Sequence, residues 1–490
     1  MAELSGAPRE ACGIFAVWNH PDPVGVVLRG LYALQHRGQE SAGMAVRTPS
    51  GELVLERGMG LVAEALPAER LERLRALGPD AALGHVRYST TGASRLENAQ
   101  PFLVRLRQGA SALAHNGELV NAARLRRTLE RRGSIFQSES DSEVIAHLVA
   151  ARPEGEVGAA FLEALHVLQG AFALALLAPS ALWAVRDPYG IRPLTLGRLG
   201  KATVVASESC ALDAVGAEPL GEVRAGEAVE IGTGGLRRLR YARPEEGDRE
   251  ALCLFELIYL ARPDTLLAGG DVHTFRKRSG RLLAREAPAE ADVVVGVPDS
   301  SLSAASGYAE ALGLPYEMGL VRNRYVGRTF IEPEEAGRGE RVRLKLNAVR
   351  PVVAGRRVVL VDDSLVRGTT ARQIVELLRS AGAAQVHLRI ASPPFRFPCG
   401  YGIDASRRGE LFAAGRSLEA MRAELGVESL AFLSLAGLLE AAGEELPAGS
   451  APASRRFCTA CFTGDYPVPL PDREEAEEAP LPPPHLEEVS

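Results

Sequence analysis

The chain has 490 residues, of which 46% are hydrophobic and 24% are charged, a composition typical of a soluble globular protein with at least two domains. Its formal net charge of −6 argues against a general nucleic-acid binder and against binding to anionic membranes. No apolar run reaches the ~18 residues that cross a bilayer, and the first eleven residues lack the apolar core of a signal peptide. Six cysteines are too few for a disulfide scaffold, so the cytoplasm is the expected compartment.

The first half of the chain alternates short β-rich runs with glycine-rich turns and a few amphipathic helices. The expected strands lie in residues 13–17, 51–58, 172–178 and 202–207. This pattern predicts a sheet-dominated α/β layer domain. The polar segment Arg237–Glu250 predicts its end, and we place this domain at residues 12–245.

Cys12, at the start of the first expected strand, is a candidate nucleophile. Four segments accompany it, residues 34–43, 84–92, 114–121 and 138–144. A thiol that attacks an amide needs donors for the oxyanion and groups that recognise the substrate. Asn116 and Gly117 could donate a side-chain amide and a backbone N–H to the oxyanion. Arg87 could bind an α-carboxylate and Asp141 an α-ammonium group.

The position of Cys12 raises the question of its base. An N-terminal cysteine carries its own α-amine, whose pKa of about 7.7 to 8 suits this role. We therefore expect residues 1–11 to be a propeptide that is removed between Ala11 and Cys12. Taken singly, the histidines of these segments, His36, His85 and His115, are more often hydrogen-bonded structural residues, and a lone cysteine near the terminus is usually inert. The joint occurrence of the five segments makes these alternatives improbable.

The second half of the chain, from about Ala251, alternates β-branched runs with helices. The units lie in residues 291–301, 356–383 and 385–394, and we place this domain at residues 246–465. Such alternation predicts a parallel sheet buried on both faces, with active residues at the C-terminal ends of its strands. Residues 466–490 are acidic and proline-rich and are expected to be disordered.

The most informative stretch of this half is RVVLVDDSLVRGTT. Asp362 and Asp363 follow an expected apolar strand and begin a loop. The small residues Gly368, Thr369 and Thr370 end this loop and lead into an expected helix. A helix N-terminus of this kind suits a phosphate, and paired acids suit ribose hydroxyls or a hydrated divalent cation. The alternative is a pair of acids that merely caps the next helix. The stretch closely resembles the 5-phosphoribosyl 1-pyrophosphate (PRPP) signature of type I phosphoribosyltransferases.

A second loop, residues 323–331, has the sequence NRYVGRTFI. Its arginines, Arg324 and Arg328, flank Gly327 and could close over a pyrophosphate, excluding water from a reactive ribosyl cation. A basic loop alone is a weak signal, because such loops are usually just solvated.

Together, the two halves resemble the amidophosphoribosyltransferase family over residues 12–465. The resemblance implies an αββα sandwich of the N-terminal-nucleophile type, which releases ammonia from glutamine, joined to a type I phosphoribosyltransferase domain with a parallel sheet. Ammonia would be channelled to the second site and displace pyrophosphate from PRPP, giving 5-phosphoribosylamine in the first committed step of purine biosynthesis. The resemblance also implies that purine nucleotides inhibit the protein and that it forms a homotetramer.

The resemblance carries roles over to individual positions. Cys12 matches the nucleophile, with Asn116 and Gly117 as the oxyanion hole. Glutamine binding falls on Arg87, Tyr88 and Asp141, and magnesium association on Ser300, Asp362 and Asp363. PRPP binding falls on Arg324, Arg328, Asp362, Asp363, Ser364, Arg367, Gly368, Thr369 and Thr370. Arg322 departs from the pattern, because many relatives have lysine there, and the two side chains bind oxygen anions differently.

The remaining cysteines suggest a metal site. Cys458 and Cys461 form a C-x2-C half-site, which by itself suits zinc and an iron-sulfur cluster equally. Cys253 and Cys399 could complete four thiolates. Their placement resembles the iron-sulfur subtype of the family, which binds a [4Fe-4S] cluster and is made with a short propeptide. Cys210 matches nothing and is expected to be a buried small residue.

Two alternatives remain open. A glutamine:fructose-6-phosphate amidotransferase would carry a sugar isomerase domain without VLVDDSLVRGTT. A PRPP-binding regulator that has lost catalysis would usually carry an added DNA-binding domain, which is not visible here, and would not require the closing loop.

Overall fold

The computed structural model describes residues 12–88, 94–106, 109–152, 155–242, 250–323, 346–405, 407–444, 454 and 456–470. The chain forms two compact units. The N-terminal unit runs to Leu252 and also contains Gly400–Ile403 and residues 466–470. The C-terminal unit contains Cys253–Cys399 and Asp404–Asp465. Within the described part of the chain, no helix combines the length and the apolar character needed to span a bilayer.

Two antiparallel sheets form the centre of the N-terminal unit. The seven-stranded sheet has the order β11-β9-β10-β1-β4-β2-β3 and consists of β1 (Gly13–Trp18), β2 (Ser41–Arg47), β3 (Leu53–Met59), β4 (Ala81–Arg87), β9 (Thr195–Leu199), β10 (Ala202–Ala206) and β11 (Glu218–Glu222). The six-stranded sheet has the order β13-β12-β8-β7-β6-β5 and consists of β5 (Phe102–Leu106), β6 (Gly109–Leu119), β7 (Gly170–Leu177), β8 (Ala181–Arg186), β12 (Glu227–Gly232) and β13 (Gly235–Arg240).

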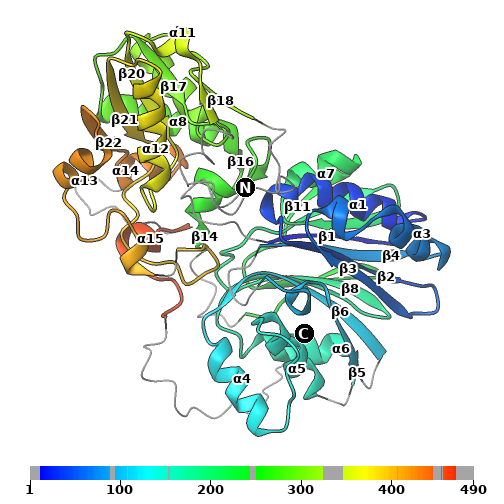
Figure 1. Ribbon diagram of the computed structural model, residues 1–490. Helices are drawn as coiled ribbons and strands as arrows, with labels where there is room; N and C mark the ends of the chain where they lie inside the picture. Colours follow the sequence, from blue (N-terminus) through cyan, green and yellow to red (C-terminus); the bar gives the residue numbers. More distant parts are fainter. Residues whose placement is uncertain are drawn as a thin grey trace. The chain divides into compact units, whose positions relative to one another are not determined.

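Helices cover the outer face of each sheet (Figure 1). The seven-stranded sheet carries α1 (Pro23–Ala33), α2 (Val62–Ala65), α3 (Ala68–Ala76) and α7 (Ser209–Val215), with the short turn η1 (Gln35–Arg37). The six-stranded sheet carries α4 (Ala122–Arg131), α5 (Ser142–Ala150) and α6 (Val157–Leu165). A further short turn is η2 (Leu96–Asn98). The layers therefore run helix, sheet, sheet, helix, which confirms the expected αββα sandwich.

The side-chain pattern of β1 explains these layers. Successive residues of a strand point to opposite faces. Ile14 and Ala16 accordingly enter the core between the two sheets. Phe15 and Val17 enter the core beneath the helices. Because both faces of the strand are buried, its sequence is continuously apolar rather than alternating.

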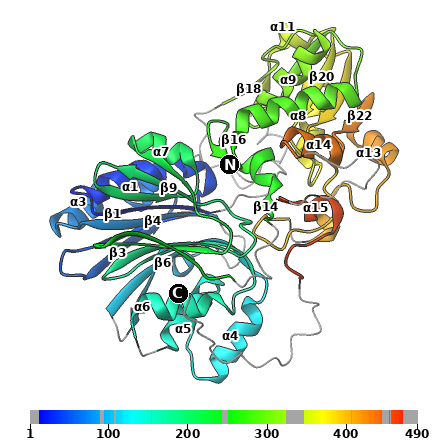
Figure 2. The same ribbon diagram turned by 180° about the vertical axis from the view of Figure 1, so that it is seen from behind.

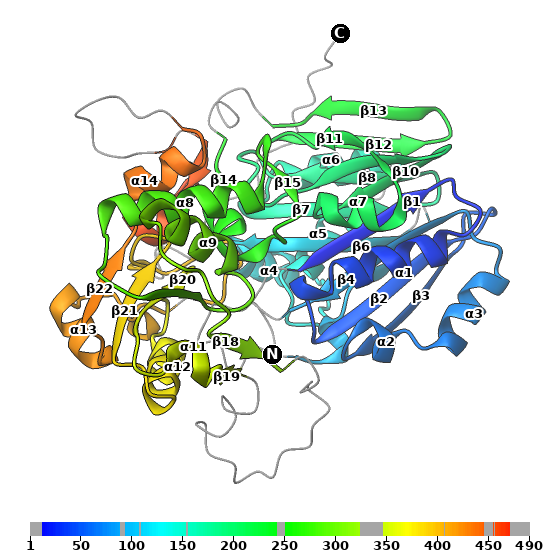
Figure 3. The same cartoon turned by 90° about the horizontal axis from the view of Figure 1, so that it is seen from above.

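The C-terminal unit contains a parallel sheet with the order β17-β20-β21-β22 (Figure 2). Its strands are β17 (Val293–Gly296), β20 (Arg357–Asp362), β21 (Gln385–Ile390) and β22 (Ser429–Phe432). One face carries α8 (Val272–Glu286), α9 (Leu302–Leu312) and α14 (Leu435–Ala441), and the other carries α12 (Thr369–Ser380) and α13 (Leu418–Leu425). Figure 3 shows α8 and α9 side by side. The predicted parallel sheet is confirmed, and the carboxyl ends of β17 and β20 lie at one edge.

Short elements complete this unit. Paired strands are β14 (Leu252–Cys253) with β23 (Phe457–Cys458), β15 (Leu266–Leu267) with β16 (Gly270–Asp271), and β18 (Leu320–Arg322) with β19 (Leu346–Ala348). The helical turns are the π-helical η4 (Glu256–Leu260), α11 (Arg350–Val353), η5 (Arg408–Glu410) and α15 (Ala460–Thr463).

Candidate active sites

Cys12 lies directly before β1 and is buried. Its Sγ donates to the Tyr88 carbonyl oxygen over 3.7 Å. Burial raises the pKa of the Cys12 thiol, while the Arg87 guanidinium and the hydrogen bond to Tyr88 act in the opposite direction. Asp141 and Arg37 also act on this pKa, so charges of both signs surround the sulfur. The thiol therefore needs a base to become a nucleophile at neutral pH.

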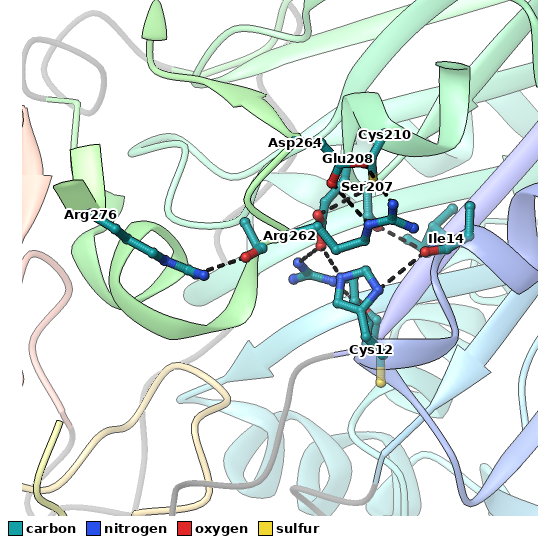
Figure 4. A network of polar contacts seen from close by, with 12 residues as sticks. Cys12, Ile14, Ser207, Glu208, Cys210, Arg262, Asp264 and Arg276 are labelled. Carbon is teal, nitrogen blue, oxygen red and sulfur yellow. Dashed lines mark hydrogen bonds and ion pairs between the residues drawn. The ribbon is translucent and has the colours of Figure 1, made fainter. Parts of the chain in front are cut away.

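A buried ion pair holds the main chain of Cys12 in place (Figure 4). Arg37, in η1, donates from Nε to the Cys12 carbonyl oxygen over 3.0 Å and from Nη1 to Glu208 Oε1 over 2.6 Å. Both charged side chains are fully buried. Ser207 Oγ accepts from the Ile14 N–H at 2.9 Å. The sulfur of Cys12 points away from this network.

Sequence reasoning missed Glu208 and its neighbours. Glu208 Oε1 also lies 2.7 Å from His36 Nε2, and Glu208 Oε2 accepts from the Cys210 thiol over 3.6 Å. Cys210 is buried, as expected, but it is part of this polar network. The only available signal was a glutamate two positions after an apolar run, which is too common to single out.

The three expected glutamine-binding residues come from two elements around Cys12. Arg87 ends β4 and is 3% exposed, and its Nη1 lies 3.9 Å from Glu40 Oε2. Tyr88 follows Arg87 and is also buried. Asp141 directly precedes α5, and its Oδ2 accepts from the Leu119 N–H over 2.9 Å. A guanidinium and a carboxylate on opposite elements can bind the two ends of an amino acid.

The expected oxyanion donors lie on β6. Asn116 is fully buried, and within the described residues neither polar atom of its side-chain amide has a hydrogen-bond partner. A buried amide without partners is costly, and a bound ligand would satisfy it. Gly117 has φ +142°, and a Cβ there would lie 2.0 Å from the Ala171 carbonyl oxygen. Only glycine fits this position, because both the backbone conformation and the close approach exclude a side chain.

The two other histidines of these segments are structural. His85 is fully buried, its Nε2 contacts the His115 carbonyl oxygen at 3.0 Å, and burial lowers the pKa of His85 to about 3. Burial also lowers the pKa of His115, whose Nδ1 lies 2.9 Å from Ser142 Oγ. Neither imidazole contacts Cys12 in the described hydrogen bonds.

The second candidate site lies at the carboxyl ends of β17 and β20. Ser301 Oγ donates to Asp362 Oδ1 over 2.9 Å, and the Ser300 hydroxyl donates to Asp363 Oδ2. Ser364 Oγ donates to Asp363 Oδ1 over 2.5 Å. Burial and the neighbouring Asp363 charge raise the pKa of Asp362 to about 8, and burial raises the pKa of Asp363. Paired carboxylates of this kind are ready to share a cation.

The loop after these acids leads into α12. Gly368, at φ +74°, precedes the helix, and a Cβ there would lie 2.6 Å from the Phe412 ring. Thr369 and Thr370 begin the helix, so the backbone N–H groups of its first turn face the loop. Arg367 donates to Glu410 Oε2 over 2.9 Å, which ties the loop to η5.

Sequence reasoning missed two further residues of this unit. Ser301 contacts both acids and is fully buried. Arg276, on α8, lowers the pKa of Asp363. It is held by the carbonyl oxygens of Leu257 and Ala261 at 2.9 and 2.7 Å (Figure 4). Arg276 therefore supplies positive charge to the acids from a fixed position.

The closing loop lies outside the described residues, and with it Arg324 and Arg328. Arg322, just before it, donates to Asp299 Oδ2 over 3.1 Å. Its contact is thus with a carboxylate of the loop that follows β17.

The four cysteines of the expected metal site belong to the C-terminal unit. Cys253 lies on β14, Cys458 on the paired strand β23, Cys461 on α15 and Cys399 in a loop, and none of the four forms a disulfide in the described structure. Burial and the charges of Cys458, Cys253 and Cys399 raise the pKa of Cys461, so the four are neighbours. No three His, Cys, Asp or Glu side chains among the described residues form a ready-made metal site.

Comparison with known protein families divides the chain into the same two halves as the two candidate sites. Residues 85–214 match the glutamine amidotransferase domain family, and residues 277–391 match the phosphoribosyl transferase domain family. The chain is 47% identical to the amidophosphoribosyltransferase of Bacillus subtilis over 96% of each chain. It is 48% identical to that of Staphylococcus aureus over 95% of this chain and 92% of the relative.

Solved structures extend the similarity to three dimensions. Glutamine PRPP amidotransferase from B. subtilis, complexed with ADP and GMP, superposes with a TM-score of 0.87 at 47% identity, over 94% of this chain and 98% of that one. A structure described as the allosteric regulatory enzyme of purine biosynthesis superposes with a TM-score of 0.88 at 46% identity, over 94% and 97%.

Proposed function

Because the chain belongs to the amidophosphoribosyltransferase family, we propose that its two sites divide one reaction between them. The enzyme transfers the amide nitrogen of glutamine to PRPP in purine biosynthesis, and the products are 5-phosphoribosylamine, glutamate and pyrophosphate. One observation carries the assignment of the glutaminase site: a buried thiol lies among Arg87, Asp141 and other charges, on the sandwich that also holds the unpartnered amide of Asn116.

In the proposed glutaminase step, Arg87 binds the α-carboxylate of glutamine and Asp141 binds its α-ammonium group. The Cys12 thiolate attacks the side-chain amide carbon, and the oxyanion accepts hydrogen bonds from Asn116 and the Gly117 N–H. As this intermediate collapses, its nitrogen takes up the proton that the thiol gave up, so that ammonia leaves and a thioester remains. Water then hydrolyses the thioester to glutamate and restores the thiol.

In the proposed transferase step, the first turn of α12 and the loop from Ser364 to Thr370 bind the 5-phosphate of PRPP. Ammonia attacks C1 of the ribose, the bond to pyrophosphate breaks, and a proton is lost from the new amine. Ser300, Asp362 and Asp363 would hold a magnesium ion, which supplies positive charge to the leaving pyrophosphate. The clustered oxygen ligands and raised carboxylate pKa values fit a bound cation.

Replacing Cys12 by alanine tests the division of labour. We expect Cys12→Ala to lose formation of phosphoribosylamine from glutamine and to keep the activity with added ammonium salt. Loss of both activities in a folded variant would contradict separate sites. PRPP binding by the unmodified enzyme without turnover, despite magnesium and ammonia, would instead favour the regulator that has lost catalysis.

We propose that residues 1–11 are a propeptide. In the full-length chain, the nitrogen of Cys12 is part of a peptide bond and cannot act as a base. The buried thiol has a raised pKa and therefore needs one. The mass of the N-terminal peptide of active enzyme tests this, and we expect it to begin at Cys12. Full glutaminase activity in a chain that retains residues 1–11 would refute the proposal.

We propose that the four-cysteine group, Cys253, Cys399, Cys458 and Cys461, ligates a [4Fe-4S] cluster. Four thiols that affect one another electrostatically are a suitable donor set, and they come from β14, β23, α15 and a loop. A bound cluster would supply a structural cross-link, since the reaction has no redox step. Anaerobically purified enzyme should contain about four iron and four acid-labile sulfide per chain. Stoichiometric zinc would reject the cluster.

The cluster assignment also has a residue-specific test. Cys461→Ser should lower the iron content and the broad visible absorption of the protein. Cys210→Ser is the matched control, because Cys210 lies in the N-terminal unit, and its iron content should not change. Equal iron in both variants would contradict the assignment.

We also propose the remaining properties that the family suggests. The first is that purine nucleotides inhibit the enzyme. This is supported by the structural relative from B. subtilis, which is a complex with ADP and GMP. The enzyme is a cytoplasmic homotetramer. Inhibition by AMP, ADP and GMP in the ammonia-dependent assay, and sedimentation of the purified enzyme, test these two statements.

A further inference from the structure

A four-residue segment from late in the sequence belongs to the N-terminal unit. Gly400–Ile403 follows Cys399 directly, yet its contacts are with the αββα sandwich. Arg192, which is fully buried, donates from Nε and Nη2 to the Tyr401 carbonyl oxygen over 3.2 and 2.7 Å. A guanidinium that places two donors on one carbonyl oxygen fixes that peptide strongly.

Arg192 is itself tied to the strand that pairs with the oxyanion strand. It follows a loop whose backbone is held by Asp187, which accepts from the N–H groups of Tyr189 at 2.9 Å and Ile191 at 3.0 Å. Asp187 Oδ2 also accepts from the Phe172 N–H over 3.2 Å. Phe172 lies opposite Gly117 in the register of β6 and β7. The loop that carries Arg192 is therefore anchored beside Gly117.

The segment also lies close to Gly117. Gly402 has φ +98°, and a Cβ there would lie 3.2 Å from the Gly117 carbonyl carbon and 3.0 Å from Arg192 Nη2. On its other side, Gly117 approaches the Ala171 carbonyl oxygen so closely that a Cβ would lie 2.0 Å away. The backbone of Gly117 is thus confined between β7 and the segment.

Tyr401 gives the segment a second anchor. Its hydroxyl donates to the Val468 carbonyl oxygen over 2.5 Å and accepts from the Val468 N–H over 3.0 Å. The Tyr401 ring meets the Tyr466 ring edge to face at 6.0 Å. The side chain is 2% exposed, so neither contact competes with much solvent.

We infer that Arg192 and the segment Gly400–Ile403 position the oxyanion hole by holding the backbone of Gly117. The inference rests on the proposed glutaminase function, and it makes this half of the enzyme depend on residues that follow Cys399. Arg192 is a positioning residue, because it acts through Tyr401 and Gly402 rather than on the substrate. A displacement of the Gly117 N–H lowers the rate of acylation and leaves the ends of glutamine bound by Arg87 and Asp141.

Two variants test the inference. Gly402→Ala places a methyl group against Gly117, and Arg192→Gln removes the paired donors. We expect each to lower kcat for glutamine hydrolysis by about 10- to 100-fold, with little change in KM for glutamine. Their matched controls are Gly234→Ala, where a Cβ meets nothing within 4 Å, and Arg198→Gln, at an exposed position on β9. The controls should keep the parental rate.

A transition-state analogue separates positioning from a general loss of structure. The aldehyde analogue of glutamine reacts with a thiol, forming a C–S bond and turning the carbonyl oxygen into a hydroxyl that occupies the oxyanion hole. Its affinity should fall by the same factor as kcat/KM, while alkylation of Cys12 by iodoacetamide and binding of glutamate stay near parental values.

The outcomes distinguish the inference from its premise. Parental kcat and aldehyde affinity in both variants would overturn the positioning role. Equal losses in aldehyde affinity, glutamate affinity and alkylation rate would overturn it too, since they indicate a disrupted unit. Absence of glutamine hydrolysis in the unmodified mature enzyme would instead refute the proposed function.

Discussion

Arg37 joins the carbonyl oxygen of the nucleophile to the carboxylate of Glu208, with 3.0 Å on one side of the guanidinium and 2.6 Å on the other. Both charges are buried, and a buried pair is destabilised strongly when one partner is removed. The pair therefore couples the stability of the N-terminal unit to the placement of Cys12.

Glu208→Gln should lower the glutamine-dependent rate and reduce the free energy of unfolding by about 3 kcal/mol or more, because Arg37 loses its counter-charge. Glutamine-dependent activity and urea unfolding measure the two effects. The control is Glu230→Gln, since Glu230 pairs with Arg237 on the surface, and it should cost at most about 1 kcal/mol. Equal effects of the two substitutions would show that the buried pair has no special role.

Asn116→Ala should separate activity from stability. Loss of an oxyanion donor lowers kcat for glutamine hydrolysis by about 10²- to 10³-fold. The free enzyme should be as stable as the parent or more stable, because the described structure gives the Asn116 amide no partner to lose. Kinetics and urea unfolding of the same preparations test both parts, and a marked loss of stability would indicate that the amide is structural.

Asp363→Asn should abolish the transferase half and spare the glutaminase half. The substitution removes a charge from the expected magnesium site, so phosphoribosylamine formation should fall at least about 100-fold with either nitrogen source. Glutamate release, assayed separately, should continue. Asp292→Asn is the control, because Asp292 lies at the surface and pairs with Arg357. A variant of Asp363 with the parental magnesium requirement would contradict the assignment.

His85 predicts part of the acid sensitivity of the fold. Its pKa falls from an ordinary 6.5 to about 3 on burial. Between these values, the unfolded chain binds a proton that the folded chain does not. Stability therefore decreases as pH falls from 6.5 towards 3, by up to about 1.4 kcal/mol per pH unit, and His85 contributes no slope above 6.5.

His85→Gln removes this contribution, and urea midpoints measured between pH 4 and 7 should show a shallower dependence than those of the parent. His20→Gln, on a surface turn, is the control. Parallel pH profiles for the parent and His85→Gln would refute the role of His85.

Much of the site was predictable because local sequence carries its chemistry. The acids Asp362 and Asp363 follow an apolar run, and Gly368 precedes the amphipathic helix α12, so their meeting at a strand end follows from the parallel sheet alone. The expected neighbours of Cys12 could likewise be named from residue types that suit amide chemistry. The order of the αββα layers could not be predicted from periodicity. Because β1 is apolar on both faces, its pattern does not show which face packs on the second sheet and which packs on helices.

The sequence by itself determined the two chemistries, because a thiol with amide and oxyanion donors, and paired acids before a helix, are written in contiguous segments. Only the tertiary structure decided how Cys12 and Gly117 are held. Glu208 is 171 positions from Arg37, and Tyr401 is 209 positions from Arg192. Partners so far apart in the chain leave no periodic or compositional signal in the sequence. Each contact forms only in the folded protein, where burial removes both polar groups from water and each must find its hydrogen-bond partner within the protein.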